Sequence, residues 1–175
     1  MKIEEYIKSL PNDIISGNEV QLPERSFRKI FEFLNLNEND SFYHLGCGDG
    51  KGIKIALQEF HVKKAVGIDN NIKKIQKAKK LVEENDLKNG KFLCEDVVTT
   101  KIDDATAILF WFTDMEIIEK MKKKFQNLQD GTRIVTIWGP LPECLPTQVD
   151  FPYIMNQTPF KPADLKEQTL AIFGI

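Results

Sequence analysis

The stretch with the clearest chemical potential is residues 43–50, which read YHLGCGDG and join an apolar run to a helix-like one. Its spaced glycines Gly46, Gly48 and Gly50 let the backbone turn sharply and approach a ligand closely. The first amides of the helix that follows favour polar or anionic groups at the same place. The loop therefore predicts a binding site for a small polar ligand.

The spacing of these glycines separates two classes of ligand. A dinucleotide site requires G-x-G-x-x-G, with a third glycine that packs the helix on the strand. Counted from Gly46, that third position is Lys51, so the dinucleotide spacing fails. The remaining G-x-G-x-G pattern is associated with S-adenosylmethionine (SAM) sites, where no pyrophosphate has to be seated. An ordinary tight strand–helix turn is the competing interpretation.

Two further acids stand where such a site needs them. Asp69 ends the next apolar run, with Asn70 after it, and is expected to accept hydrogen bonds from two ribose hydroxyls. Asp96 follows the third apolar run and could read the adenine amino group, while Val97 could pack on the ring. For Asp96 alone, an acid in a solvated loop fits the sequence equally well.

An alternation of strand-like and helix-like segments positions these residues. We expect strands at 41–45, 65–68, 91–94, 105–112 and 133–138, and helices at 51–60, 71–85 and 115–128. The strand at 105–112 lacks polar alternation, which is typical of strands covered on both faces. This order predicts an α/β fold built on a doubly wound, mostly parallel sheet with right-handed crossovers.

A length of 175 residues suits one domain, so we expect a single domain over 1–175. Its parts would be an N-terminal helical segment at 1–40, a cofactor-binding core at 41–139 and C-terminal strands and loops at 140–175. The first part should contain helices near 1–10 and 24–36. In the last part, prolines interrupt helices, and 151–155 and 169–173 are expected to form a closing antiparallel strand pair.

Composition and charge exclude several classes of protein. The 24 Lys and Arg against 26 Asp and Glu leave a formal charge of −2, which argues against a polybasic nucleic-acid clamp. The longest nearly apolar stretch is far shorter than the ~20 residues that a bilayer requires, and 1–10 lacks a secretory signal. Cys47, Cys94 and Cys144 form no CxxC pair, so we expect no metal, no membrane partner and a cytoplasmic location.

With the loop, the acid and the strand order in hand, the sequence resembles the class I SAM-dependent methyltransferases. More narrowly, it resembles the small archaeal protein-lysine methyltransferases, from about Leu22 to the C-terminus. The matching runs are LPER at 22–25, HLGCGDG at 44–50, VKKAVGID at 62–69, FWFTD at 110–114 and DGTRIV at 130–135. The resemblance implies SAM as cofactor, S-adenosylhomocysteine as product, and a protein that carries a lysine as substrate.

The expected cofactor contacts are His44, Gly46, Cys47, Gly48, Gly50, Asp69, Asn70, Asp96 and Val97. His44 stands where the family usually has an acid, so it should bind the cationic cofactor less well unless it forms a hydrogen bond. A partly buried histidine with a backbone partner is the alternative. We expect no chemistry from Cys47. The family also tends to have Thr-Asn at 113–114 and a threonine at Leu22, and these departures bear mainly on the substrate.

Residues 110–114 should lie at the carboxyl end of the fourth strand, where ligands of open α/β sheets gather. A lysine ammonium must lose a proton before it can attack, and an apolar aromatic slot favours the neutral amine. We therefore expect Trp111 and Phe112 to form the walls of a slot, with Asp114 or the Thr113 carbonyl orienting the amine. Core packing of Trp111 is an alternative, and for the side chains of Thr113 and Glu116 we favour a helix capping box.

The charges are distributed unevenly along the chain. Residues 61–92 contain nine lysines and four acids, whereas 93–119 contain seven acids and one lysine. Acids near the site would suit a cationic, lysine-bearing substrate better than a phosphate-rich one. Methylation of RNA or of a small molecule stays an alternative, as does a non-catalytic SAM-fold binding protein. The sequence leaves the oligomeric state open.

Overall fold

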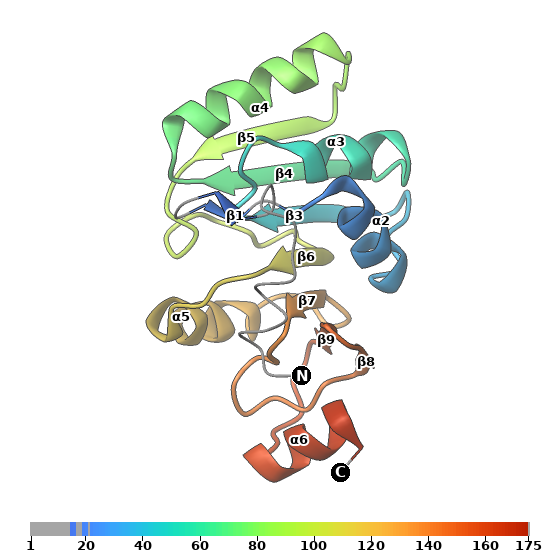
Figure 1. Ribbon diagram of the computed structural model, residues 1–175, viewed down its shortest axis with the longest axis vertical. Coiled ribbons are helices and arrows are strands. Elements are labelled where there is room, and N and C mark those ends of the chain that lie inside the picture. Colours follow the sequence, from blue (N-terminus) through green and yellow to red (C-terminus); the bar gives the residue numbers. More distant parts are fainter. Residues whose placement is uncertain (1–14, 17–18, 21, 175) are drawn as a thin grey trace.

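The computed structural model describes residues 15–16, 19–20 and 22–174 (Figure 1). The helix expected near 1–10 lies outside the described residues. The first elements are β1 (Ile15–Ser16) and β2 (Glu19–Val20), which pair antiparallel. Within the described part of the chain, no helix combines the length and the apolar character that crossing a bilayer requires.

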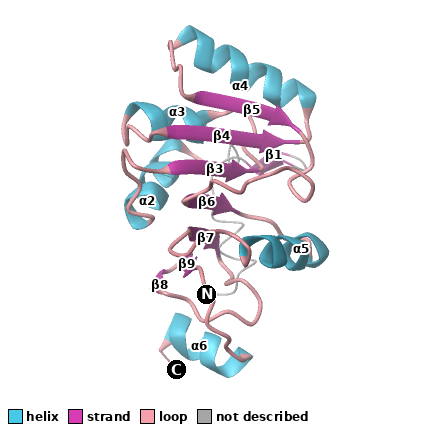
Figure 2. Ribbon diagram, turned by 180° about the vertical axis from the view of Figure 1, so that it is seen from behind, coloured by secondary structure: helices cyan, strands magenta, loops and turns pink. Residues whose placement is uncertain are grey.

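A seven-stranded sheet forms the centre of the molecule (Figure 2). In their order across the sheet, its strands are β5 (Gly90–Cys94), β4 (Lys64–Asp69), β3 (Ser41–Leu45), β6 (Ala107–Phe110), β7 (Arg133–Ile137), β9 (Tyr153–Gln157) and β8 (Gln148–Asp150). The first five run parallel, and β9 and β8 run antiparallel to their neighbours. The expected α/β fold with a mostly parallel sheet is confirmed.

Helices cover both faces of the sheet. Successive residues of each strand point to opposite sides, so each face buries a different set of side chains. On one face, Phe42 and Leu109 share a core cluster with residues of α2 (Glu24–Phe33), α3 (Lys51–Gln58) and α4 (Ile72–Glu84). On the other face, Tyr43 and Ile108 pack in a second cluster with α5 (Met115–Phe125). The sheet is therefore doubly wound, and the hydrophobic cores on its two faces form separate clusters.

The C-terminal region corrects one expectation. Residues 169–173 are not a strand but the end of α6 (Leu165–Phe173), which lies at one end of the molecule (Figure 1). Asp164 and Glu167 form a reciprocal capping box at its start, and Gly174 ends it with a left-handed backbone. The antiparallel pair is instead β8 with β9, so the sheet edge that 169–173 was expected to occupy is already taken.

Candidate active site

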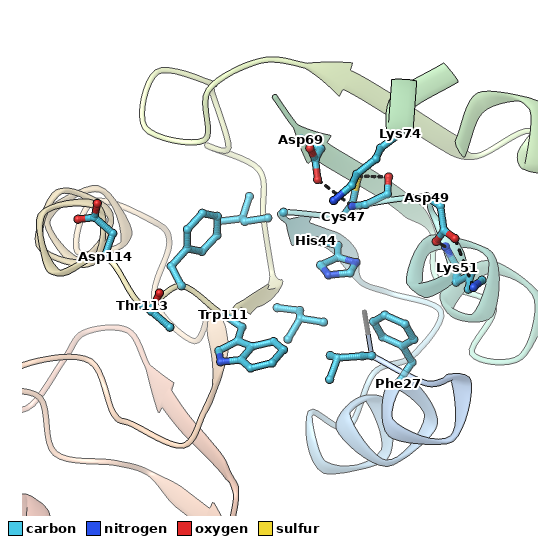
Figure 3. Close-up of a pocket in the computed structure, with 16 residues that line it drawn as sticks. Phe27, His44, Cys47, Asp49, Lys51, Asp69, Lys74, Trp111, Thr113 and Asp114 are labelled. Atoms are coloured by element: carbon cyan, nitrogen blue, oxygen red, sulfur yellow. Dashed lines mark hydrogen bonds and ion pairs between the residues drawn. The ribbon is translucent and has the colours of Figure 1, made fainter. Parts of the chain in front are cut away.

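A pocket of about 320 Å³ opens at the carboxyl edge of the parallel strands β3, β4 and β6 (Figure 3). The described residues around it are Leu22, Phe27, His44, Leu45, Gly46, Cys47, Gly48, Asp49, Lys51, Asp69, Lys74, Leu109, Trp111, Phe112, Thr113 and Asp114. The turn after β3, the end of β4, the segment after β6 and the start of α2 thus meet at one place. A volume of this size is typical of a small-molecule site.

The glycine loop forms one side of the pocket. Gly46 has a φ of 78°, a left-handed conformation that favours glycine, and a Cβ atom there would be in contact with the Phe112 ring at 3.4 Å. The backbone amides of Gly46 and Cys47 donate to the Ile68 carbonyl at 2.8 and 3.0 Å. These bonds fix the loop to β4 and keep it open toward the pocket.

Gly50 is a glycine that close packing and backbone conformation both require. A Cβ atom at this position would lie 2.8 Å from both Ala78 and Phe92, and the left-handed φ of 85° also favours glycine. Gly50 is buried and is not among the described residues of the pocket wall. It lets the start of α3 pack closely on α4 and β5, and a contact of its backbone with the cofactor stays a prediction.

Asp69 ties the glycine loop to the beginning of α4. One carboxylate oxygen accepts the Gly48 amide at 2.9 Å, and the other accepts the Asn71 amide at 2.9 Å. Asn71 in turn caps α4 by accepting the amides of Lys73 and Lys74. A carboxylate offers about four acceptor positions, so Asp69 keeps capacity for two more hydrogen bonds on the pocket side.

His44 is a buried polar side chain in the wall of the pocket. It is 6% exposed, and its Nδ1 atom has no hydrogen-bond partner among the described residues. The backbone partner that the sequence suggested as an alternative is therefore not found for this nitrogen. The Phe27 ring lies edge-on at 5.5 Å between centroids, and a Cβ atom at Gly52 would come within 2.9 Å of Nδ1. Burial lowers the pKa of His44 to about 4, although Asp69 and Asp49 act in the opposite direction. The imidazole is therefore neutral at physiological pH.

Cys47 lies in the loop but is buried at 4% exposure. Burial raises the pKa of its thiol well above the usual value, and a nearby negative charge from Asp69 adds to the effect. A Cβ atom at Gly67 would come within 2.7 Å of its Sγ atom, so the cysteine occupies the space that this glycine leaves. A protonated, buried thiol of this kind packs the loop and is a poor nucleophile.

The segment after β6 places two aromatic rings at the pocket. Phe112 stacks on the buried Phe110 with 4.9 Å between ring centroids, and it also faces Gly46. Trp111 also borders the pocket (Figure 3), and its ring meets Trp138 edge-on with 5.6 Å between ring centroids. Both rings are half-buried and both line the pocket, so they flank it from two sides.

The capping box expected between Thr113 and Glu116 is wrong. Asp114 is the N-cap of α5, and its Oδ1 atom accepts the amides of Glu116 and Ile117 at 2.8 and 3.3 Å. Carboxylates are strong caps, and their charge also interacts favourably with the helix dipole. Thr113 and Asp114 are exposed, and both line the pocket.

Comparisons with known proteins agree with this geometry. The family model of a methyltransferase domain matches residues 42–133. A curated protein-lysine N-methyltransferase of Saccharolobus islandicus (strain REY15A) is 33% identical over 120 residues, which cover 67% of this chain and 73% of that protein. The chain belongs to the methyltransferase-domain family. It is a SAM-dependent methyltransferase of class I.

Solved structures share the fold of this methyltransferase. An RNA methyltransferase from Salinibacter ruber, solved with S-adenosyl-L-homocysteine, superposes with a TM-score of 0.75 at 24% identity. The match covers 83% of this chain and 99% of that one. A geranyl diphosphate C-methyltransferase from Streptomyces coelicolor A3(2) gives a TM-score of 0.57 at 17% identity over 65% of this chain and 44% of that one.

The pocket of the methyltransferase fits SAM. Asp69 has acceptor positions for ribose hydroxyls, and the neutral His44 lines the pocket, with its Nδ1 atom buried beside Gly52. The open glycine loop leaves space between them, since a side chain at Gly46 would meet Phe112. Among the described residues, no group of three or more His, Cys, Asp or Glu side chains is placed to hold a metal ion.

Three expected contacts lie outside the described pocket wall: Asn70, Asp96 and Val97. Asp96 is exposed, and its Oδ1 atom accepts the Val98 amide at 2.8 Å, while Val97 is buried in the second core cluster. Lys124 donates to three backbone carbonyls of this loop, those of Val97, Val98 and Thr100. Contacts of Asp96 and Val97 with adenine stay predictions.

Several pocket residues carried no signal in the sequence. Phe27 comes from α2 and Lys74 from α4, and both reach the pocket only because these helices pack against the sheet. Asp49 and Lys51 form an ion pair of 3.3 Å at the rim. Leu22 stood in one of the matching runs and could have been found from it, whereas Phe27 repeats at helical spacing like any core residue.

Proposed function

We propose that this methyltransferase transfers methyl groups to lysine side chains of proteins. The observation that carries the proposal is the pair of half-buried rings, Trp111 and Phe112, on two sides of the pocket, followed by Thr113 and Asp114. The curated relative is described as a protein-lysine N-methyltransferase, which supports the same substrate class.

The bound SAM supplies a methyl group on a sulfonium, which is already a good leaving group. The apolar faces of Trp111 and Phe112 favour the uncharged form of an entering amine, so a lysine ammonium loses its proton to solvent on the way in. The same two rings exclude water and hold the amine in a narrow range of orientations, which accounts for much of the rate that such an enzyme needs. After transfer, their π-faces stabilise the methylated cation.

Asp114 and Thr113 can orient the amine at the entrance. The cap of α5 uses Oδ1 of Asp114, and no described residue donates a hydrogen bond to Oδ2, so this oxygen can accept one from the substrate. The Thr113 carbonyl belongs to the same exposed turn. An amine donates two hydrogen bonds when neutral, and these acceptors would direct its lone pair toward the pocket.

The acids of this edge favour a cationic substrate. The hydrogen bond to Glu116 raises the pKa of Lys120, and the charges of Asp96 and Asp114 add smaller effects in the same direction. The loop after β5 and the start of α5 therefore present negative charge on the same side. A lysine-rich protein segment would approach this side with favourable electrostatics, especially at low salt.

RNA methylation is the second candidate function, and one surface favours it. Lys73, Lys77 and Lys80 lie three or four residues apart on α4 and are exposed. Lys74 of the same helix lines the pocket. This row of lysines could neutralise phosphates of a polynucleotide whose target base enters the pocket.

Methyl transfer from radiolabelled SAM tests the proposal. The protein is incubated with a lysine-rich protein, with the same protein after reductive dimethylation of its lysines, and with tRNA. We expect label in the first sample, at least tenfold less in the second and none in the third, with methyl-lysine identified after hydrolysis. Label in tRNA alone would contradict the lysine proposal, and label in no sample would favour a non-catalytic protein that binds SAM.

A further inference from the structure

Trp138 has a backbone conformation that few tryptophans adopt. Its φ of 70° lies in the left-handed region, where a bulky side chain is strained. The next residue, Gly139, could take such a conformation without cost, and a Cβ atom there would meet nothing within 4 Å. The chain therefore places its turn on the tryptophan although a glycine is adjacent, which points to a use for the side chain at this position.

The surroundings of Trp138 hold it firmly. It follows β7 directly, and its backbone amide donates to the Pro152 carbonyl at 2.7 Å. Ile137 pairs with Tyr153 in the antiparallel ladder, so the turn is fixed to the start of β9. The indole is half-buried and packs on the first core cluster.

Among the described residues, Trp111 connects Trp138 to the pocket. Trp138 is not among the described residues of the pocket wall, whereas Trp111 is. The two indoles meet edge-on, with 5.6 Å between centroids and 81° between planes. This is the preferred arrangement of an aromatic pair, and it restricts the rotation of the Trp111 side chain.

We propose that Trp138 is a positioning residue that fixes the Trp111 indole as a rigid wall of the amine slot. This inference rests on the proposed function, since it assigns Trp111 to the slot for a lysine amine. The strained turn at Trp138 directs its indole against the back of Trp111, and the bond to Pro152 keeps that turn in place. Without this support, Trp111 rotates away, the amine loses alignment, and the turnover number falls while SAM affinity is unchanged.

The chain has two tryptophans, so replacing Trp138 leaves Trp111 as the sole fluorescent indole. Time-resolved fluorescence anisotropy then measures the local motion of Trp111 whether or not the enzyme is active. In Trp138→Phe, which keeps an aromatic edge, we expect slow, global tumbling only. In Trp138→Gly, which accepts the positive φ but lacks the ring, we expect an additional fast component. Equal anisotropy decays in the two variants would overturn the proposal.

Kinetics supply the second readout, with Trp138→Gly, Trp111→Ala and the double variant. We expect kcat for a lysine-bearing protein to fall about tenfold in Trp138→Gly. If Trp138 acts through Trp111, the double variant is no slower than Trp111→Ala alone. If the two residues act independently, their fold-losses in kcat multiply in the double variant. Multiplied effects would overturn the proposal. Calorimetry should give the same dissociation constant for SAM in Trp138→Gly and the wild type, and a weaker one would mean that the turn supports the cofactor site instead.

Phe33→Leu serves as the matched control for general loosening. Phe33 packs on the same cluster, but its ring contact is with Tyr153 at 6.2 Å. We expect it to lower thermal stability without changing the anisotropy decay of Trp111, measured in the Trp138→Phe background. If the wild type labels no lysine while the two Trp138 variants differ in anisotropy, the proposed function fails and the support of Trp111 by Trp138 stands.

Discussion

The two edges of the parallel sheet are built from the same strands in different ways. At the amino edge, Asp40 lies just before β3 and accepts hydrogen bonds from the Asn37 amide, the Thr106 hydroxyl and the Arg133 guanidinium. Arg133 also donates to the carbonyls of Leu34 and Asn35. At this edge the polar groups therefore form hydrogen bonds with one another.

The carboxyl edge leaves polar groups available. Among the residues that the structure describes, the buried Nδ1 atom of His44 has no hydrogen-bond partner, and the two oxygens of Asp69 accept from backbone amides alone. Gly46 holds its turn in a left-handed conformation beside an aromatic ring. We therefore propose that residues of the same strands serve stability at the amino edge and ligand binding at the carboxyl edge.

Asp40→Ala, at the amino edge, should have the largest effect on the stability of the protein. Asp40 is 3% exposed, and its removal would leave the largely buried Arg133 guanidinium without its counter-charge. We expect a loss of about 3–5 kcal/mol in the free energy of unfolding, measured by urea denaturation. SAM affinity of the remaining folded protein should be unchanged. A loss below ~1 kcal/mol would show that this network contributes little.

His44, at the carboxyl edge, should make the free energy of unfolding depend on pH. Because its pKa is lowered to about 4 in the folded protein, the unfolded chain binds the proton more readily. The free energy of unfolding is therefore highest above pH ~6.5 and falls by about 3 kcal/mol on this account as the pH falls to ~4. We expect His44→Leu to remove this part of the pH dependence in urea denaturation.

The second histidine provides the control for that measurement. His61 is exposed and has a left-handed backbone, which asparagine tolerates well. His61→Asn should keep the pH dependence of the wild type. Equal slopes for His44→Leu and the wild type would contradict the assignment of a buried, neutral imidazole.

Asp104→Asn should have the smallest effect. Asp104 pairs with Lys64 at 2.7 Å and accepts from the Tyr43 hydroxyl at 2.6 Å, but its side chain is 57% exposed. Exposed ion pairs contribute about 0–1 kcal/mol, so the melting temperature should fall by a few degrees at most. A large loss of SAM affinity in this variant would contradict the proposal that the two edges have different roles.

Local patterns were sufficient to predict most of the parallel sheet. The apolar run at 41–45 is β3 with the expected bounds, and α4 begins after Asn71, whose cap follows from its side chain. These segments succeed because burial on one face or both leaves a clear periodicity. The run at 169–173 misled because threonine and isoleucine favour strands, whereas Asp164 and Glu167 already carried the signature of a helix start.

The composition of the site could be predicted only in part. His44, Gly46 and Asp69 follow directly from strand ends, and the structure brings them together. Phe27 could not be predicted, since its place in the pocket depends on how α2 packs across the sheet. The contact of Trp138 with Trp111 likewise joins turns that follow different strands, and no local spacing indicates it.

Calorimetric titration with SAM on three proteins tests the central claim most directly, that the carboxyl edge holds the cofactor. The wild type should bind SAM, Asp104→Asn should bind it with the same dissociation constant, and Asp69→Ala should bind at least tenfold more weakly because the ribose acceptor is lost. Tenfold corresponds to about 1.4 kcal/mol. An unchanged constant in Asp69→Ala, or no binding by the wild type at millimolar SAM, would contradict the account.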